Sequence, residues 1–594
     1  MNIQDYQSTY HMLMDTVNRI PDKKAYRWFD SQLQPHDVTW RQFVKEVDQL
    51  AGALLAFGLK KDEKVTILSN TNYQWVLTDV ATASAGGVTV GIYQTLLAPD
   101  CQYIIDHSDS VIIFAEDLAQ VKKIAEVRSE LTKVRQVVLF RGESEEPWVQ
   151  TFEEFLALGK TFPEASLKSV RDQLVPEDSA TIVYTSGTTG LPKGAELSHK
   201  NMTFSTQSVV QCVQTQVDDE TLLFLPLAHV FARILVYAAL HYGATTNFAR
   251  SVDTLIEDLG LVKPHWFASV PRVYEKVFSK INSGAEAKGG VALKLFRWAV
   301  AVGAQASALK AQHKPISGIT ALKYQIANKL VFSKIHAALG GRVRWAISGA
   351  APLNAEIAKF FDGAGVPILE GIGMTENTSF SNVNRYDNYK FGTVGQAGPG
   401  VEIKIGEDGE FMVRGDNVMK GYYKMPDKTA ETIDSEGWLL TGDLATIDEE
   451  GFVTITGRKK DLIITSGGKN VAPSKLEGTI ALSQFINQVC VVGDRHNYLC
   501  ALVTIDIDNV KEYAAANGID AQGETDLIAN DEIKNLIMNE VEKSNQEFAS
   551  FETIKKITLV PEFTLENDML TPTMKVKRNI VMQRYADAIE AMYH

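Results

Sequence analysis

Short apolar runs alternate with helix-like segments over the first third of this 594-residue chain. The segment 38–60 spaces its apolar residues at helical intervals, and Gly58 is placed to end that helix. The apolar runs, which have the length and composition of buried strands, lie at 64–69, 88–92, 110–115, 137–140 and 180–184. Strands that alternate with helices predict a mostly parallel, doubly wound α/β sheet.

The last of these strands leads into a loop of glycine and hydroxyl residues. The loop reads Tyr184-Thr-Ser-Gly-Thr-Thr-Gly-Leu-Pro-Lys193-Gly194. Glycine lets the backbone approach an anion closely, and successive N–H groups form a concave site of positive partial charge. A Walker loop is excluded because Gly194, and not Ser or Thr, follows the lysine. A loop at a strand end of an open α/β sheet is well placed to bind phosphate, although glycine content alone would also suit a flexible surface loop.

The full string resembles the phosphate-binding signature of the adenylate-forming superfamily. That superfamily comprises acyl-CoA synthetases, luciferases and peptide-synthetase adenylation domains, and the resemblance runs from about residue 8 to the end of the chain. It implies that ATP binds to the loop residues, which are Thr185, Ser186, Gly187, Thr188, Thr189, Gly190 and Lys193.

Further segments resemble the adenine-binding parts of the superfamily. The segment 348–353 matches an adenine-side loop, in which Ala350 stands where glycine is common. In the segment 371–376, Ile372 takes the place of an aromatic residue that stacks on adenine in many members, so we expect adenine to lie on aliphatic surface. The remaining residues assigned to nucleotide binding by the resemblance are Ala351, Pro352 and Gly373 for adenine, and Asp443 and Arg458 for ribose.

Adenylation brings a carboxylate to the α-phosphate of ATP, so cations and donors must converge on crowded negative charge. The resemblance assigns Thr375 to phosphate contact and Glu376 to Mg²⁺, a hard cation that prefers oxygen ligands. Lys575 matches the catalytic lysine, a compact charge able to neutralise both reacting anions. Its neighbour Met574 replaces a common glycine, which predicts a stiffer loop. His229 matches a histidine that borders the acyl cavity, although an isolated histidine in an apolar run is more often a packed core residue.

The second half-reaction would involve CoA and a moving domain. In the superfamily the small domain rotates after adenylation, and Lys460 matches the hinge position. A hinge needs only a residue that can absorb a change in backbone angles. The loop expected to line the CoA tunnel after this rotation includes Gly467, Gly468 and Lys469.

The expected fold class is α/β with two parts. A large N-terminal domain of doubly wound sheets, residues 1–458, includes a helical insertion at about 280–338 and a small β subdomain at about 392–456. A smaller, mobile α+β domain, residues 459–594, carries the catalytic lysine. Such a division fits the length, which exceeds that of a single core.

Charge and composition restrict the partners. The net charge of −14 argues against nucleic acid, whose phosphates require a basic surface. Four scattered cysteines and the absence of a signal peptide or apolar span predict a cytoplasmic protein without a transmembrane segment. Peripheral contact with the inner face of a membrane and a homodimer both stay open.

These motifs together predict an AMP-forming long-chain fatty acid:CoA ligase. ATP with Mg²⁺ would activate a fatty acid to acyl-AMP, and CoA would then take the acyl group. The long-chain assignment comes from the helical insertion and from the segment 436–461, which resemble the larger fatty acyl-CoA synthetases. The alternatives are a fatty acyl-AMP ligase that loads a carrier protein and a medium-chain acyl-CoA synthetase. A non-catalytic nucleotide-binding or scaffold protein would be expected to lack Lys575 or Glu376.

Overall fold

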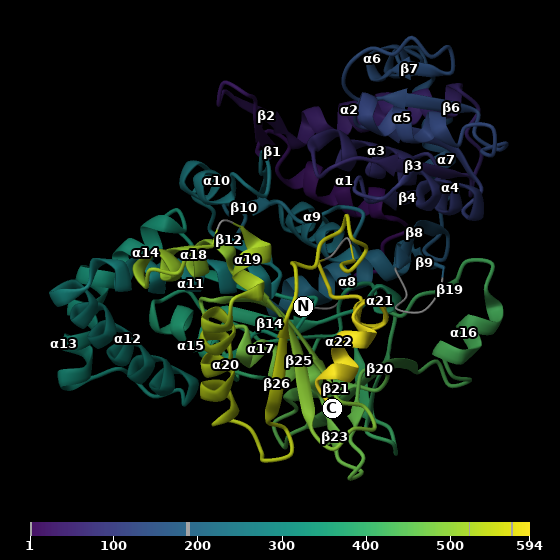
Figure 1. Ribbon diagram of the computed structural model, residues 1–594. Coiled ribbons are helices and arrows are strands. Elements are labelled where there is room, and N and C mark those ends of the chain that lie inside the picture. The colour runs from purple at the N-terminus through teal and green to yellow at the C-terminus, as the bar shows by residue number, and fades with distance from the viewer. Residues whose placement is uncertain (1–2, 186–190, 522, 572–573) are drawn as a thin grey trace.

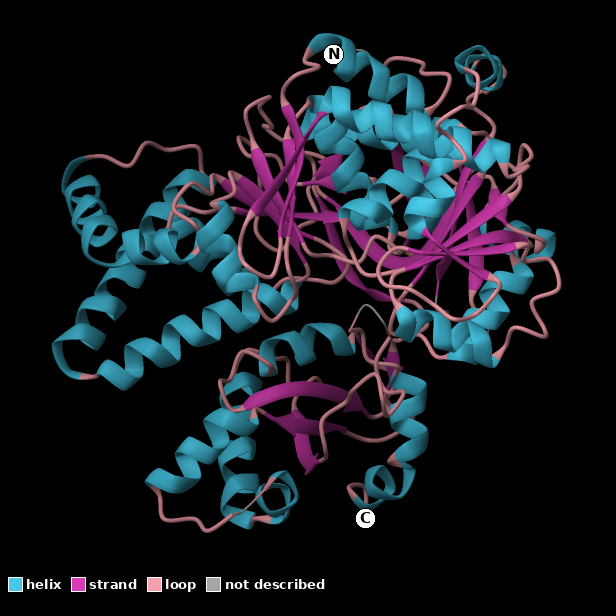
Figure 2. Cartoon of the chain, turned by 90° about the horizontal axis from the view of Figure 1, so that it is seen from above, coloured by secondary structure: helices cyan, strands magenta, loops and turns pink. Residues whose placement is uncertain are grey.

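A computed structural model describes residues 3–185, 191–521, 523–571 and 574–594 (Figure 1). Two large sheets with flanking helices form the N-terminal part, and a smaller α+β part follows. Figure 2 shows the two sheets side by side, with helices between and around them. One continuous hydrophobic core includes residues of both sheets, such as Val65 in the first and Trp345 in the second.

The first sheet has eight strands and contains every strand predicted from the apolar runs. Its order is β19-β9-β8-β4-β3-β5-β6-β7. The predicted strands β3, β4, β5, β6 and β8 pair in parallel, as expected for a doubly wound sheet. The strands are β3 (Lys64–Leu68), β4 (Val88–Ile92), β5 (Ser110–Ala115), β6 (Gln136–Leu139), β7 (Val149–Thr151), β8 (Ser179–Thr185), β9 (Lys193–Ser198) and β19 (Gly421–Tyr422).

Helices connect and cover these strands as the helical spacing predicts. The predicted helix within 38–60 is α2 (Trp40–Ala56), which begins at a capping box formed by Thr39 and Gln42. It ends just before Gly58, whose φ of 95° suits only glycine without strain. Other helices of this part are α1 (Thr9–Arg19), α3 (Tyr73–Ser84), α4 (Ala98–His107), α5 (Leu118–Glu126), α6 (Phe152–Ala157) and α7 (Glu164–Arg171).

The second sheet has nine strands in the order β16-β15-β14-β13-β12-β10-β11-β1-β2. Its parallel centre consists of β10 (Glu220–Leu223), β11 (Thr245–Phe248), β12 (Trp266–Ser269), β13 (Trp345–Ser348) and β14 (Ile368–Ile372). The outer strands are β1 (Lys24–Phe29), β2 (Pro35–Thr39), β15 (Asn382–Val383) and β16 (Gln396–Ala397). Two adjacent helices, α8 (His199–Cys212) and α9 (Val230–Tyr242), pack against each other. Their buried faces belong to the shared core.

A group of helices projects from this sheet, at the left of Figures 1 and 2. It includes the segment predicted as a helical insertion, about 280–338, and extends beyond that segment at both ends. Gly303 and Gly363 allow two of these helices to approach closely, because a Cβ at Gly303 would lie 3.3 Å from the Gly363 backbone. The helices are α10 (Leu255–Val262), α11 (Pro271–Lys288), α12 (Gly290–Ala311), α13 (Gly318–Ala327), a π-helical stretch (Asn328–Phe332), α14 (Ser333–Ala338) and α15 (Ala355–Gly363).

A small antiparallel sheet follows, where a β subdomain is predicted. Its strands are β17 (Glu402–Ile405), β18 (Glu410–Arg414), β20 (Leu439–Ile447) and β21 (Val453–Arg458). A turn that contains Gly406 joins β17 to β18. The short helix α16 (Pro426–Thr432) lies between β19 and β20 in the chain.

The C-terminal part has a hydrophobic core of its own, built from residues between Ile463 and Leu559. Its strands are β22 (Ile463–Ile464), β23 (Asn470–Val471), β24 (Ile486–Val492), β25 (Leu499–Ile505) and β26 (Ile554–Leu559). Its helices are α17 (Pro473–Ile480), α18 (Ile507–Ala516), α19 (Glu524–Ala529), α20 (Asp531–Asn545), α21 (Arg578–Arg584) and α22 (Ala586–Ala591). The predicted fold class, a large α/β part followed by a smaller α+β part, is confirmed. Among the residues described, no helix combines the length and apolar character needed to cross a bilayer.

Candidate active site

The two ends of the predicted phosphate loop are held by paired strands. Thr185 ends β8 and pairs with Lys193, the first residue of β9. The Thr185 hydroxyl also donates a hydrogen bond to the Lys193 carbonyl at 3.3 Å. The predicted residues between them, 186–190, lie outside the described ranges. The sheet therefore fixes where the loop begins and where its lysine emerges.

Tyr422 links this lysine to the predicted Mg²⁺ ligand. Tyr422 on β19 pairs with Ala195 on β9, and Lys193 lies two residues earlier on the same face. The Lys193 Nζ lies 4.0 Å from the centroid of the Tyr422 ring, and the Tyr422 hydroxyl donates to Glu376 Oε1 at 2.5 Å. Burial, followed by the negative charge of Glu376, raises the pKa of Tyr422 far above its ordinary value, so the phenol stays protonated. Burial lowers the pKa of Lys193, and Glu376 opposes that shift.

Thr375 and Glu376 lie together in a buried 3₁₀ turn (Thr375–Asn377) at the end of β14. Gly373 is required just before this turn, because a Cβ there would lie 2.0 Å from the Ser379 carbonyl oxygen. The Met419 amide donates to the Glu376 carbonyl at 2.8 Å, which ties the turn to the chain entering β19. Thr375, Glu376 and Lys193 are thereby held by one continuous set of backbone contacts.

The predicted adenine-side loop follows β13 directly. Ala350, where glycine is common in the superfamily, has a φ of 71°, a left-handed conformation that is costly for a residue with a Cβ. Glu370 on β14 accepts a hydrogen bond from the Leu353 amide at 3.2 Å and so joins this loop to the neighbouring strand. Burial raises the pKa of Glu370 to about 7, although backbone hydrogen bonds oppose the shift.

His229, Ala350, Ile372 and Gly373, which the resemblance assigns to the acyl and adenine sites, line one cavity. The other walls come from α8, α9, β13 and the residues after β14; they include Val209, Phe231, Ile234, Leu235, Ile347 and Phe380. Most of the lining is apolar. Aliphatic surface from Ile372 therefore faces this cavity, where many members of the superfamily place an aromatic ring.

His229 is the residue before α9, and its Nδ1 accepts the Phe231 amide at 3.1 Å. Accepting that bond leaves the proton of the neutral ring on Nε2. Burial, followed by the charge of Lys575, lowers the pKa of His229 to about 4. At neutral pH the residue is therefore an uncharged N–H donor.

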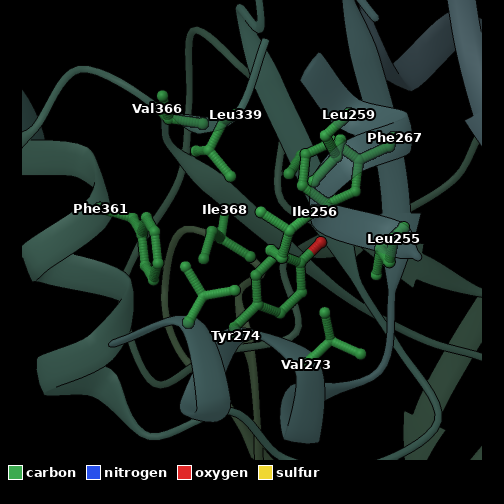
Figure 3. A pocket seen from close by; sticks show the side chains of 12 residues that line it. Leu255, Ile256, Leu259, Phe267, Val273, Tyr274, Leu339, Phe361, Val366 and Ile368 are labelled. Carbon is green, nitrogen blue, oxygen red and sulfur yellow. The ribbon is translucent and has the colours of Figure 1, made fainter. Parts of the chain in front are cut away.

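A second cavity lies on the opposite face of the same sheet (Figure 3). Ala346 lines the second cavity and Ile347 lines the first, and successive side chains of a strand point to opposite faces. The lining of the second cavity is apolar, and its Tyr274 hydroxyl donates to the Ile347 carbonyl at 2.7 Å. It is therefore separated by the sheet from the residues predicted to bind nucleotide.

The predicted ribose residues face each other across two strands. Asp443 on β20 is the register partner of Arg458 on β21, and the Asp443 Oδ1 lies 3.7 Å from the Arg458 Nε. Burial raises the pKa of Asp443, while the charges of Arg458 and Lys575 oppose that shift. The pair thus offers a carboxylate and a guanidinium at one point of the small sheet.

Lys575 reaches this site from the C-terminal part. Its pKa is lowered first by burial and then by Arg458, whereas Asp443 and Glu376 raise it. The residue as a whole still exposes more than a third of its surface. Lys575, Asp443, Glu376 and His229 therefore share one electrostatic environment, although they come from distant parts of the sequence.

The predicted hinge and CoA-tunnel residues lie elsewhere. Lys460 is exposed in the turn that follows β21. Gly467, Gly468 and Lys469 form the turn between β22 and β23, in which the Gly468 amide donates to the Thr465 carbonyl at 2.8 Å. In Figure 1 the β23 end of the C-terminal part lies far from the loop that precedes α21 and carries Lys575. The structure thus brings Lys575 near Arg458, Asp443, Glu376 and His229, but it does not bring the CoA-tunnel turn to them.

Sequence reasoning missed Tyr422, Glu370 and Glu410. Glu410 is buried, accepts the Gly442 amide at 2.7 Å and lies 2.8 Å from the Lys459 Nζ, so it supports the turn that carries Asp443. The sequence signal that could have identified Glu370 and Glu410 is a charged residue inside a strand pattern. Tyr422 carries no such signal, because tyrosine is ordinary in a strand.

The family described as AMP-binding enzyme matches residues 13–423, and the one described as AMP-binding enzyme C-terminal domain matches residues 460–594. The chain is 35% identical over 563 residues to the long-chain-fatty-acid–CoA ligase FadD15 of Mycobacterium bovis, with 94% of this chain and 92% of the relative covered. It is 31% identical to the long-chain-fatty-acid–CoA ligase ACSBG2 of Xenopus laevis, with 98% of this chain and 84% of the relative covered.

Two solved structures have the same fold. The adenylation domain of a carboxylate reductase from Mycobacterium chelonae superimposes with a TM-score of 0.80 at 21% identity, covering 99% of this chain and 91% of that one. The anthranilate CoA ligase AuaEII, in complex with anthranoyl-AMP, gives a TM-score of 0.75 at 19% identity, covering 100% and 99%.

Proposed function

Because the chain belongs to the AMP-binding enzyme family, we propose that it is an AMP-forming long-chain fatty acid:CoA ligase. The observation that carries this proposal is that Lys575 lies within the electrostatic influence of both Glu376 and Asp443. A cation from the C-terminal part and two carboxylates from the large part suit a reaction in which one anion attacks another. The relatives named as long-chain-fatty-acid–CoA ligases support the fatty acid as substrate.

In the first half-reaction the fatty carboxylate attacks the α-phosphate of ATP and pyrophosphate leaves. Lys193 and the loop it follows would hold the phosphates, and Lys575 would offset the charge that gathers as the two anions approach. Asp443 and Arg458 would hold the ribose hydroxyls. The neutral His229, with its proton on Nε2, would donate a hydrogen bond at the border of the acyl cavity.

The residues present fit Mg²⁺. Glu376 offers one buried carboxylate beside Thr375, and Mg²⁺ commonly takes one or two protein carboxylates while phosphates and water complete its octahedron. Among the described residues no cluster of three or more potential ligands competes for the ion. When bound, Mg²⁺ would offset charge on the phosphate oxygens. Tyr422 would position Glu376 for that ion through its 2.5 Å hydrogen bond.

In the second half-reaction the CoA thiol attacks the acyl carbonyl, which yields the thioester and AMP. The turn Gly467 to Lys469 lies away from the present site, so it could line a CoA tunnel only after the C-terminal part turns about a hinge at Lys460. The present arrangement would be the adenylating one. The hydrogen bonds from Arg272 to Asn487 and from Ser283 to Gln484 would then form and break with each cycle.

The location also belongs to the proposal. Long-chain acids dissolve poorly and partition into lipid, so a ligase that uses them would gain from peripheral contact with the inner face of a membrane while residing in the cytoplasm. A homodimer stays a prediction.

A panel of fatty acids of increasing chain length, supplied with ATP, Mg²⁺ and CoA, tests the reaction. Mass detection should find AMP and the acyl thioester in equal amounts, with the highest kcat/KM for long chains. Replacing CoA with a carrier protein tests the acyl-AMP ligase alternative, which predicts transfer to the carrier and little thioester with CoA. Formation of ADP instead of AMP would refute the proposed chemistry.

A further inference from the structure

The helical extension has a charge opposite to that of the whole chain. Between Glu286 and Glu356, 69 residues include ten Lys or Arg and no Asp or Glu. The chain as a whole has a net charge of −14. This stretch forms most of α12 to α14, the helices that project furthest from the sheets in Figures 1 and 2. Seven of the ten lie on these helices or between them, whereas Arg342 and Arg344 follow α14 and pair with Glu220 and Asp219. Positive charge is therefore concentrated on one projection of an acidic protein.

The same projection exposes an apolar stripe. Ile319, Leu322, Ile326 and Leu330, on α13 and the π-helical stretch after it, are spaced three or four residues apart and so share one face. Their exposed fractions are 74%, 60%, 44% and 42%. Other residues of the same segment pack inward, and among them Ala327 and Phe332 are almost fully buried. Four large aliphatic side chains therefore face away from the protein on one helix.

Lysines border this stripe. Lys323 and Lys329 alternate with its apolar residues, Lys334 follows, and all three are exposed. Across the described ranges, the carboxylate partners in this extension belong to other cations, such as Asp362 with Lys310 at 3.6 Å and Glu286 with Arg297 at 3.9 Å. An apolar helix face bordered by unpaired lysines is the pattern of a helix that lies in the interface of an anionic bilayer.

We propose that α13 and the π-helical stretch after it dock this protein on an anionic lipid surface, with their apolar stripe, residues 319 to 330, among the acyl chains and the bordering lysines at the headgroups. The two features are complementary to the two layers of a leaflet: phosphates for the ammonium groups and hydrocarbon for the aliphatic groups. Nucleic acid would use the lysines and leave the stripe uncovered. The choice of lipid over a protein partner also rests on the proposed function, because long-chain acids partition into bilayers.

Flotation of the full chain with vesicles tests this surface. Wild type should float with phosphatidylglycerol–phosphatidylcholine vesicles, and much less with pure phosphatidylcholine or at high salt. The double variant Leu322→Asn/Ile326→Asn should reduce the bound fraction at least tenfold, since two large aliphatic groups no longer enter the hydrocarbon. A triple variant at Lys323, Lys329 and Lys334, each changed to Gln, should lose the preference for anionic lipid.

A matched control is Leu118→Asn, because Leu118 is 51% exposed at the start of α5, on a different part of the molecule. It should bind vesicles as wild type does. All variants should keep their kcat with a detergent-dispersed acid, since the stripe is remote from Lys575.

Equal flotation of wild type and the double variant, or flotation of neither, would overturn the docking proposal. Loss of self-association in the double variant would instead make the stripe a contact between copies. Failure of the wild type to form any thioester would refute the ligase proposal, whereas the flotation result does not depend on that activity.

Discussion

Lys193 and Lys575 bring positive charge to the same site from two different parts of the chain. Lys193 begins β9, a strand paired with β8 on one side and β19 on the other, and its ammonium lies over the Tyr422 ring. The Lys575 carbonyl accepts a hydrogen bond from the Thr571 amide at 2.8 Å, and among the described residues no strand of the large part pairs with Lys575. One lysine is thus placed by a sheet and the other by the packing of one domain on another.

The two lysines therefore differ in the steps at which they can act on bound phosphate. A charge fixed in the sheet that carries the phosphate loop can serve every step in which phosphate is bound. Contacts such as that of Ser283 with Gln484, at 2.9 Å, hold the C-terminal part, which carries Lys575, against the large part. Both ammonium groups have a pKa lowered mainly by burial, so each is poised to gain from an anionic ligand. We expect Lys575 to act in one half-reaction only.

The largest expected effect is that of Lys575→Ala on adenylation. Removing a positive charge from the developing transition state should lower the rate by roughly 100- to 1,000-fold. Thioester formation from synthetic acyl-AMP and CoA should stay within about threefold of wild type, because the α-phosphate has then already reacted. Pyrophosphate exchange measures the first step and thioester release measures the second.

Lys577→Ala is the matched control, since Lys577 lies two residues away and pairs with Asp568 at 2.5 Å instead of facing the site. It should leave both half-reactions unchanged. Equal losses in the two half-reactions of Lys575→Ala would contradict the assignment of Lys575 to adenylation alone.

A smaller effect is expected from Tyr422→Phe, which tests how Tyr422 positions Glu376 beside the sheet-held Lys193. The variant keeps a ring beneath Lys193 but removes the 2.5 Å hydrogen bond to Glu376. Because a hydrogen bond to a charged group contributes about 1.5–3 kcal/mol, the Mg²⁺ concentration for half-maximal adenylation should rise roughly tenfold or more. Calorimetric binding of ATP at several Mg²⁺ concentrations, without acid, should show the same shift.

Tyr423→Phe is the control, because the adjacent hydroxyl donates to Asp109 at 3.0 Å, away from Glu376. Its Mg²⁺ dependence should match that of wild type. An unchanged Mg²⁺ midpoint in Tyr422→Phe would show that this hydroxyl only packs the core.

The sequence predicts five of the eight strands of the first sheet, because each of those apolar runs is short and bounded by polar turns. Its register is harder to foresee. Tyr422 meets Glu376 through β19, a two-residue strand that pairs with β9 more than 200 residues earlier, and such a short strand has no periodicity to detect. The replacements of glycine at Ala350 and Met574 are visible in the sequence, but their φ values of 71° and 62° are set by tertiary contacts.

The smallest expected effect concerns the turn that presents Lys575. With a φ of 62°, Met574 is strained in a way that costs a residue with a Cβ roughly 1–2 kcal/mol, more than the ~0.5–1 kcal/mol of backbone entropy that glycine loses. The free energy of unfolding of Met574→Gly, measured by chemical denaturation, should therefore equal that of Met574→Ala or exceed it by up to about 1 kcal/mol. Met582, 39% exposed within α21, should show the reverse order by about 1 kcal/mol. If the Gly and Ala variants rank in the same order of stability at both positions, the turn that precedes Lys575 is not strained at Met574.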